Sequence, residues 1–70
     1  MIYFFARAGQ FTRCEIHPGR PHRMIVCSPD GLEQIEQHSS SDELHTRWED
    51  LCDRLKADGW SGPFVRDPRV

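Results

Sequence analysis

The 70-residue sequence has no long apolar run. A membrane-spanning helix needs about 20 consecutive apolar residues, so we expect no membrane span. The apolar opening, residues 2–5, is followed by Arg7, which is too early for the apolar stretch of about 7–15 residues in a signal peptide. We therefore expect a cytoplasmic protein whose three cysteines are reduced thiols.

Motifs of nucleotide and nucleophile chemistry are also missing. The sequence has no glycine-rich phosphate loop, dinucleotide fingerprint or serine-nucleophile elbow. His38 and His45 stand near Asp42 and Glu43, an arrangement that could resemble an acid–base set. Histidines outside an apolar pattern are more typical of a solvated surface, and so short a chain rarely builds a cleft. We predict neither enzymatic activity nor a cofactor.

Positive charge is scarce and unevenly distributed. Lys56 is the single lysine beside eight arginines, and the formal net charge is −2. Residues 1–28 carry +3, whereas residues 29–70 carry −5. A basic first half is compatible with an acidic partner, but the acidic total is unusual for a dedicated nucleic-acid binder.

Short apolar runs between turn residues predict an antiparallel sheet. Residues 2–8 and 10–17 read as a hairpin, with a turn at residues 8–10 in which Gly9 takes a positive φ at low cost. Residues 22–28 predict a third strand after a loop that contains two prolines. The turn at residues 28–31 leads to residues 32–37, which we interpret as a short fourth strand, a helical turn being the alternative.

The second half predicts one amphipathic helix of about 17 residues. Its start carries a capping box formed by Ser40 and Glu43, and its end carries Gly59, followed by a tryptophan that packs back on the last turn. Salt bridges are expected between Glu43 and Arg47 and between Asp50 and Arg54. The apolar stripe that faces the sheet consists of Leu44, Trp48, Leu51, Cys52 and Leu55.

These elements predict a single α+β domain over residues 1–70. A three- or four-stranded antiparallel sheet is packed on one face by a single C-terminal helix, and residues 66–70 form a frayed tail. If the strand faces coincide, aromatic and arginine side chains share one exposed face, which would consist of Tyr3, Phe5, Arg7, Phe11, Arg13 and Arg23. Alternatively, the first strand turns these aromatics under the helix and points Ile2 and Phe4 outward.

An exposed aromatic face has two functional interpretations. Aromatic rings stack on bases and arginines pair with phosphates, so the face could bind nucleic acid. Exposed apolar surface more often marks a protein contact, either with another protein or in a homodimer. Because the net charge is negative, we favour a non-enzymatic protein-interaction module, with nucleic-acid binding as the alternative.

A zinc module is a lesser alternative. The spacing of Cys14, His17, His22 and Cys27 is close to that of a zinc knuckle, whose thiolate and imidazole ligands suit a tetrahedral metal. Both cysteines nevertheless lie in apolar strand patterns, where a free cysteine behaves as a small buried hydrophobe. We therefore predict no metal.

One set of segments in the second half carries a resemblance, and it consists of Ser28-Pro29-Asp30-Gly31, Leu44, Arg47-Trp48, Leu51, Leu55 and Asp58-Gly59-Trp60-Ser61-Gly62-Pro63. Together these segments resemble a group of small uncharacterised bacterial proteins with a strand-rich start and one long helix. The resemblance covers residues 28–63 and implies the same fold and a bacterial origin, with no activity to carry over.

Overall fold

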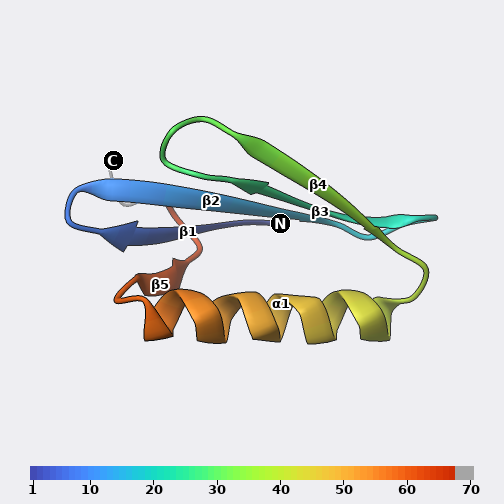
Figure 1. The fold of residues 1–70 in the computed structure, drawn as a ribbon. Coiled ribbons are helices and arrows are strands. Elements are labelled where there is room, and N and C mark those ends of the chain that lie inside the picture. Colours follow the sequence, from blue (N-terminus) through green and yellow to red (C-terminus); the bar gives the residue numbers. More distant parts are fainter. Residues whose placement is uncertain (68–70) are drawn as a thin grey trace.

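The alternating apolar residues of the first half form an antiparallel sheet, which has five strands in the computed structural model (Figure 1). The structure describes residues 1–67. In chain order the elements are β1 (Ile2–Arg7), β2 (Gln10–His17), β3 (His22–Cys27), β4 (Glu33–His38), α1 (Ser41–Ala57) and β5 (Ser61–Phe64). The strand order across the sheet is β4-β3-β2-β1-β5. The expected α+β class is confirmed, and residues 33–38 do form a fourth strand.

Two tight turns set the strand register. The β1–β2 turn is Ala8-Gly9, with φ values of 50° and 78°, and a two-residue turn with two positive φ angles matches the twist of a hairpin. The β3–β4 turn closes when the N–H of Gly31 donates to the carbonyl of Ser28 at 2.9 Å. The N–H of Ser28 then donates to the carbonyl of Leu32, also at 2.9 Å, which begins the β3–β4 ladder.

The fifth strand is an addition to the sequence-based prediction, because β5 follows the helix that was expected to end the fold. β5 pairs with the free side of β1, with Phe64 opposite Phe4, Ser61 opposite Ala6 and a shift of register between these two pairs. Gly62 permits this approach, because a Cβ there would lie 2.8 Å from the Phe4 carbonyl oxygen. Of the expected frayed tail, Asp67 is half-buried, and residues 68–70 lie outside the described residues.

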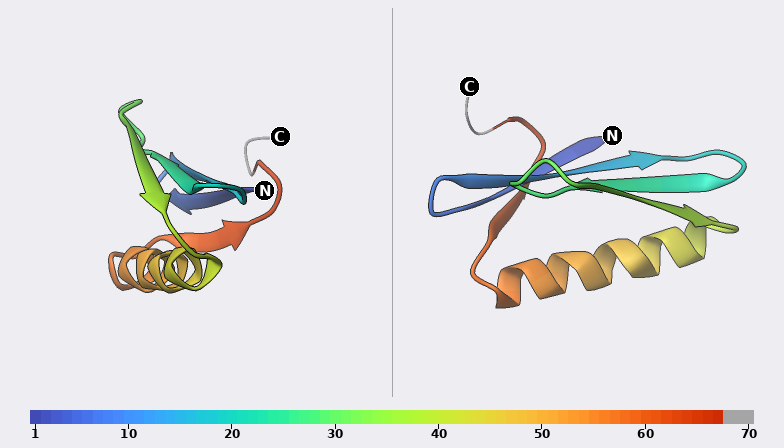
Figure 2. Two further views of the ribbon diagram at one scale, coloured as in Figure 1. Left: turned by 90° about the vertical axis from the view of Figure 1, so that its right-hand side faces the viewer. Right: turned by 45° about the horizontal axis from the view of Figure 1, so that its top comes forward.

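The helix covers one face of the sheet, and among residues 1–67 no helix or further strand layer covers the other face (Figure 2). Under it, Phe5, Cys14 and Met24 have no exposed surface. Leu44 and Leu51 of α1 pack on this core, as the predicted stripe requires. The Trp48 ring of α1 lies 4.7 Å from Tyr3 and 5.9 Å from Phe5, so it joins the helix to β1.

Local signals in the sequence fix both ends of α1. The Ser40 hydroxyl accepts from the N–H of Glu43, and the Glu43 carboxylate accepts from the N–H and hydroxyl of Ser39. These hydrogen bonds from Ser39 lower the pKa of Glu43. The predicted Glu43–Arg47 pair is wrong, because the Arg47 guanidinium turns to Glu36 on β4.

At the C-terminal end, Gly59 has the expected positive φ of 89°. Its N–H donates to the Lys56 carbonyl, and the N–H of Trp60 donates to the Leu55 carbonyl at 2.9 Å. This pair of hydrogen bonds is a Schellman motif, and Trp60 is buried beside it as predicted. The Asp50–Arg54 pair is also confirmed, with 3.1 Å between the Asp50 carboxylate and Arg54 Nε.

Replacing Trp48 by alanine is expected to lower the free energy of unfolding by about 3 kcal/mol, the lower end of the range for large buried aromatics, because Trp48 is half-buried. A domain of this size holds only about 3–5 kcal/mol in total, so the variant should keep at most about 2 kcal/mol and melt at a much lower temperature. Thermal melting followed by circular dichroism measures this. His45→Ala, on the exposed side of the same helix, is the control, and equal melting temperatures would contradict the core role of Trp48.

Gly62→Ala should lower the melting temperature more than Gly31→Ala. Both glycines have positive φ, 131° and 89°, so alanine is strained at each. A Cβ at Gly31 meets nothing within 4 Å, whereas one at Gly62 meets the Phe4 carbonyl and the Phe5 ring. This overpacking adds about 1–3 kcal/mol of destabilisation. Equal losses in the two variants would show that β5 does not need the close approach to β1.

Candidate interaction surface

The six residues predicted to share one exposed face are divided between the two faces of the sheet. Directly opposed residues of antiparallel strands point to the same side, and here Phe5 faces Thr12 while Ala6 faces Phe11. Tyr3, Phe5 and Arg7 therefore point to the helix side, and Phe11, Arg13 and Arg23 point to the other. The prediction of one combined face is wrong, and the alternative, with Ile2 and Phe4 outward, is observed.

Arg7 has a structural position on the helix side. Its Nη1 donates to the Asp58 carbonyl at 2.8 Å and lies 2.7 Å from the Asp58 carboxylate. Its guanidinium also lies 4.8 Å from the centre of the Trp60 ring, within cation–π range. Arg7 thus ties β1 to the C-terminal end of α1 and is turned away from the uncovered side.

We call the uncovered side of the sheet the open face. Three of its large apolar side chains are well exposed, at 45% for Ile2, 62% for Ile35 and 40% for Phe64, which is opposite Phe4. Phe4, Phe11 and Ile25 on the same face are half-buried. The sequence-based site included no residue of β4, although Ile35, the single apolar residue of that strand, was a signal. The open-face residues of β1 to β4 are Ile2, Phe4, Ala6, Phe11, Arg13, Glu15, His17, Arg23, Ile25, Cys27, Glu33, Ile35 and Gln37.

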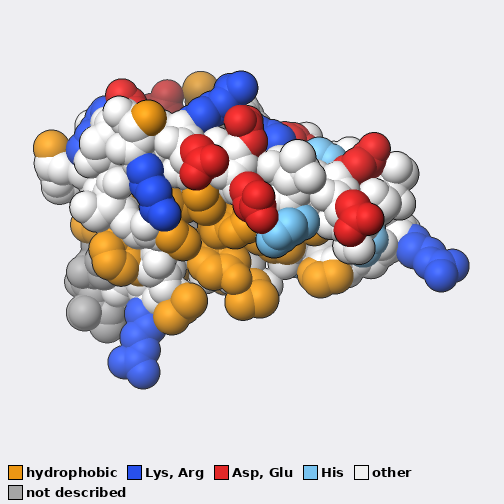
Figure 3. All heavy atoms as spheres, turned by 90° about the horizontal axis from the view of Figure 1, so that it is seen from below, with side chains coloured by type: hydrophobic (Ala, Val, Ile, Leu, Met, Phe, Trp, Pro, Cys, Tyr) orange, Lys and Arg blue, Asp and Glu red, His pale blue; other side chains and the backbone are white. Residues whose placement is uncertain are grey.

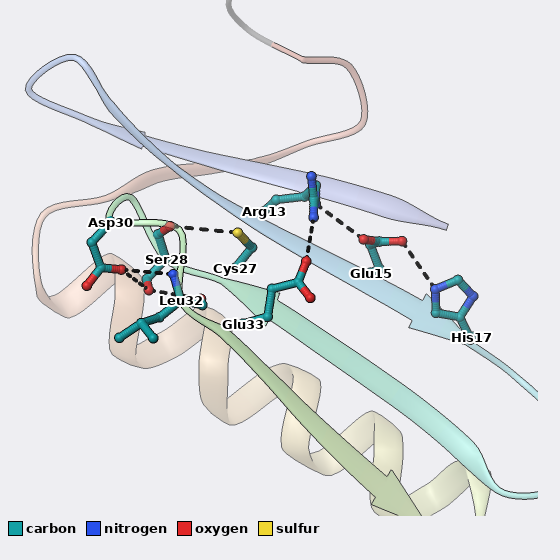
Figure 4. A network of polar contacts seen from close by, with 8 residues as sticks. All are labelled: Arg13, Glu15, His17, Cys27, Ser28, Asp30, Leu32 and Glu33. Atoms are coloured by element: carbon teal, nitrogen blue, oxygen red, sulfur yellow. Dashed lines mark hydrogen bonds and ion pairs between the residues drawn. The ribbon is translucent and has the colours of Figure 1, made fainter.

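The two glutamates of the open face, Glu15 and Glu33, both pair with Arg13 (Figure 4). Arg13 on β2 lies 3.2 Å from Glu15 through Nε and 3.2 Å from Glu33 on β4 through Nη2. Oε1 of Glu15 also lies 3.3 Å from Nε2 of the His17 ring. Figure 4 shows the network crossing β3 from β2 to β4. Each exposed pair is worth little in stability, about 0.2–1 kcal/mol, but the pairing cancels the charge of Arg13.

A second polar cluster joins the helix to β4 on the covered side. Arg47 makes a two-pronged contact with Glu36, 2.9 Å from Nε and 3.0 Å from Nη2, and its Nη1 lies 3.5 Å from Asp50. The hydrogen bonds that Arg47 donates to Glu36 raise the pKa of Arg47, against the opposing effect of burial. His38 also lies 3.3 Å from Glu36.

The groove between α1 and β4 has a volume of about 770 Å³ and is open to solvent. The His38–His45 acid–base arrangement, which was considered from the sequence but not favoured, is not assembled in it, because His45 pairs with Glu49 at 2.6 Å on the exposed side of α1. The groove is therefore the boundary where α1 packs beside β4. Its lining residues are Gln37, His38, Asp42, Glu43, Thr46, Arg47 and Asp50.

The cysteines and histidines of the zinc-knuckle spacing are also separated. Cys14 and His22 are on the helix side, whereas His17 and Cys27 are on the open face. Cys14 is fully buried, and burial, followed by the nearby Cys52, raises the pKa of its thiol to about 12. Within residues 1–67, no group of three or more histidine, cysteine, aspartate or glutamate side chains is placed to hold a metal ion.

No helix in the described part of the chain is long and apolar enough to cross a membrane. No protein-family model matches this chain, and no curated protein and no solved structure matches it. The assignment of a function therefore depends on the geometry described above.

The raised pKa of Cys14 predicts a reactivity order and a pH dependence. Iodoacetamide at about pH 8.5 should modify the half-buried Cys27 and Cys52 before Cys14, because the thiolate is the nucleophile. Peptide mass spectrometry of the native and the urea-unfolded chain measures the order.

Since folding raises this pKa from 9.0 to about 12, the folded chain keeps a proton that the unfolded chain loses. The associated stability is complete below pH 9.0 and is lost as the pH rises toward 12. In the iodoacetamide experiment, modification of Cys14 before Cys27 and Cys52 in the native chain would contradict the burial of Cys14.

Proposed function

We propose that this chain is a non-enzymatic interaction module that binds protein, a second copy of itself included, through the open side of its sheet. The observation that carries the proposal is the uncovered face with three large hydrophobic side chains, Ile2, Ile35 and Phe64, exposed to 40% or more. Exposed apolar surface with a polar surround is typical of protein contacts.

The paired charges of the open face favour protein over nucleic acid. Of the arginines considered for phosphate contacts, Arg7 is engaged with Asp58 on the helix side, and Arg13 is engaged with two carboxylates. Arg23 remains on the open face outside these pairs. A duplex or single strand needs a continuous basic track, which a chain of net charge −2 with this pairing does not supply.

The proposal also places the module in a bacterial cytoplasm. Its three free cysteines fit a reducing compartment, and a bacterial origin follows from the resemblance of residues 28–63. A non-enzymatic role is favoured because His38 and His45, the two histidines considered for acid–base chemistry, lie beside different glutamates, Glu36 and Glu49, and do not form one site.

Sedimentation velocity at several protein concentrations, with titration of short single- and double-stranded oligonucleotides, tests the proposed function. We expect reversible self-association that changes little between low and high salt, because apolar contacts are not screened. We expect no oligonucleotide binding near physiological salt. A monomer at every concentration that binds oligonucleotide with a steep salt dependence would reverse the assignment.

A further inference from the structure

β4 is an edge strand whose outer backbone groups point away from the sheet. The β3–β4 ladder begins with the N–H of Ser28 donating to the carbonyl of Leu32. Antiparallel residues alternate between pairs that exchange hydrogen bonds and pairs that do not, so Gln34 and Glu36 bond inward to β3. The intervening residues therefore turn their N–H and C=O groups outward, and these are Glu33, Ile35 and Gln37.

The other edge of the sheet is protected. β5 has four residues and contains Pro63, which has no N–H to offer a neighbouring strand. β4 has six residues with neither proline nor lysine, and its two charged side chains, Glu33 and Glu36, are each paired with an arginine of the same chain. Its central side chain, Ile35, is 62% exposed on the open face. The sheet is thus open to an added strand at β4.

The side chains of β4 are complementary to those of a second β4 strand that runs antiparallel to it. When two copies of Glu33-Gln34-Ile35-Glu36-Gln37 run antiparallel about a two-fold axis at Ile35, every glutamate faces a glutamine and the isoleucines face each other. Moving the axis to Glu36 would oppose two glutamates, and moving it to Gln34 would oppose Glu33 with Ile35. A one-residue slip would turn the open face of one copy to the helix side of the other.

The same register satisfies the free backbone. The two Ile35 residues exchange hydrogen bonds across the axis, and Glu33 of each copy exchanges them with Gln37 of the other, since all three have outward backbone groups. Ile25 is opposite Ile35 within one copy, so the open face gains an unbroken row of isoleucines across the junction.

The carboxylates at this edge are already neutralised within each copy. Glu33 is held by Arg13 at 3.2 Å, and Glu36 is held by Arg47 at 2.9 Å. The edge therefore approaches its copy without a concentration of unpaired negative charge. Figure 1 shows the strand at the margin of the sheet, with α1 beneath rather than beside it.

We propose that two copies of this chain pair through β4, antiparallel about Ile35, into one continuous sheet of twice five strands. This inference rests on the proposed function, for which it names the partner and the contact. The paired sheet presents one enlarged open face, and both helices lie on the opposite side.

The first test places a lysine on the two-fold axis. Ile35→Lys should convert the wild-type dimer to a monomer in sedimentation experiments, because two ammonium groups would face each other. Val65→Lys is the matched control, since Val65 is 72% exposed and follows the far strand β5. That variant should remain a dimer. Circular dichroism verifies that both variants are folded.

The second test reads the register. Gln37→Lys puts a lysine opposite Glu33 of the other copy and should lower the dimer Kd by about threefold to tenfold. Gln37→Glu puts two carboxylates together and should raise the Kd by a similar factor. Gln37 is exposed, so neither change affects the core. Opposite effects support the pairing even where Ile35→Lys does not fold, and equal or absent effects overturn it.

The remaining outcomes separate this inference from the proposed function. Phe11→Glu, on β2 and away from the edge, should leave the dimer intact. A dimer that withstands Ile35→Lys but dissociates with Phe11→Glu would overturn the β4 pairing and leave the open-face module standing. A wild-type chain that is monomeric at every concentration would overturn the β4 pairing.

Discussion

The two-residue turn at Ala8-Gly9 determines how the whole molecule is divided into an inside and an outside. Because both residues take positive φ, Arg7 faces Gln10 and the β1–β2 register is fixed. That register places Phe5 and Cys14 on one side, where α1 covers them, and Phe4 and Arg13 on the other. A turn with one residue more would exchange the faces of one strand relative to the other, since side chains alternate with a period of two.

The same turn explains what could be predicted from the sequence. The strands, the helix, the Ser40 cap and the Gly59 end depend on signals within a few residues, and all are found in the structure. The combined aromatic face depended on a turn of residues 8–10, which would put Phe5 and Arg13 together. In the structure the turn consists of residues 8–9. Local propensities were therefore sufficient to predict the strands, but not to predict which side chains of β1 and β2 point to the same face of the sheet.

Contacts between distant segments were beyond such local signals. Arg47 has a suitable partner one helical turn away in Glu43, yet it binds Glu36, because burial beside β4 gives it a two-pronged contact with a carboxylate that also needs a partner. β5 depends on Gly62 meeting the Phe4 carbonyl, a contact across almost the whole chain. The residue types of Ser61-Gly62-Pro63 predict an end to regular secondary structure, but pairing with β1 overrides that local preference.

One helix cannot cover both faces of a five-stranded sheet, and this limit connects the fold to its proposed role. Phe5, Met24 and Leu51 are buried between α1 and the sheet. Ile2 and Ile35, on the other side of the sheet, remain exposed to water. The apolar content of the sheet therefore exceeds what the helix buries. Of the two edges, β5 is closed to a further strand by Pro63 and β4 is open. The excess apolar surface and the free backbone meet at Ile35, so protein contact is favoured at the edge where both are available.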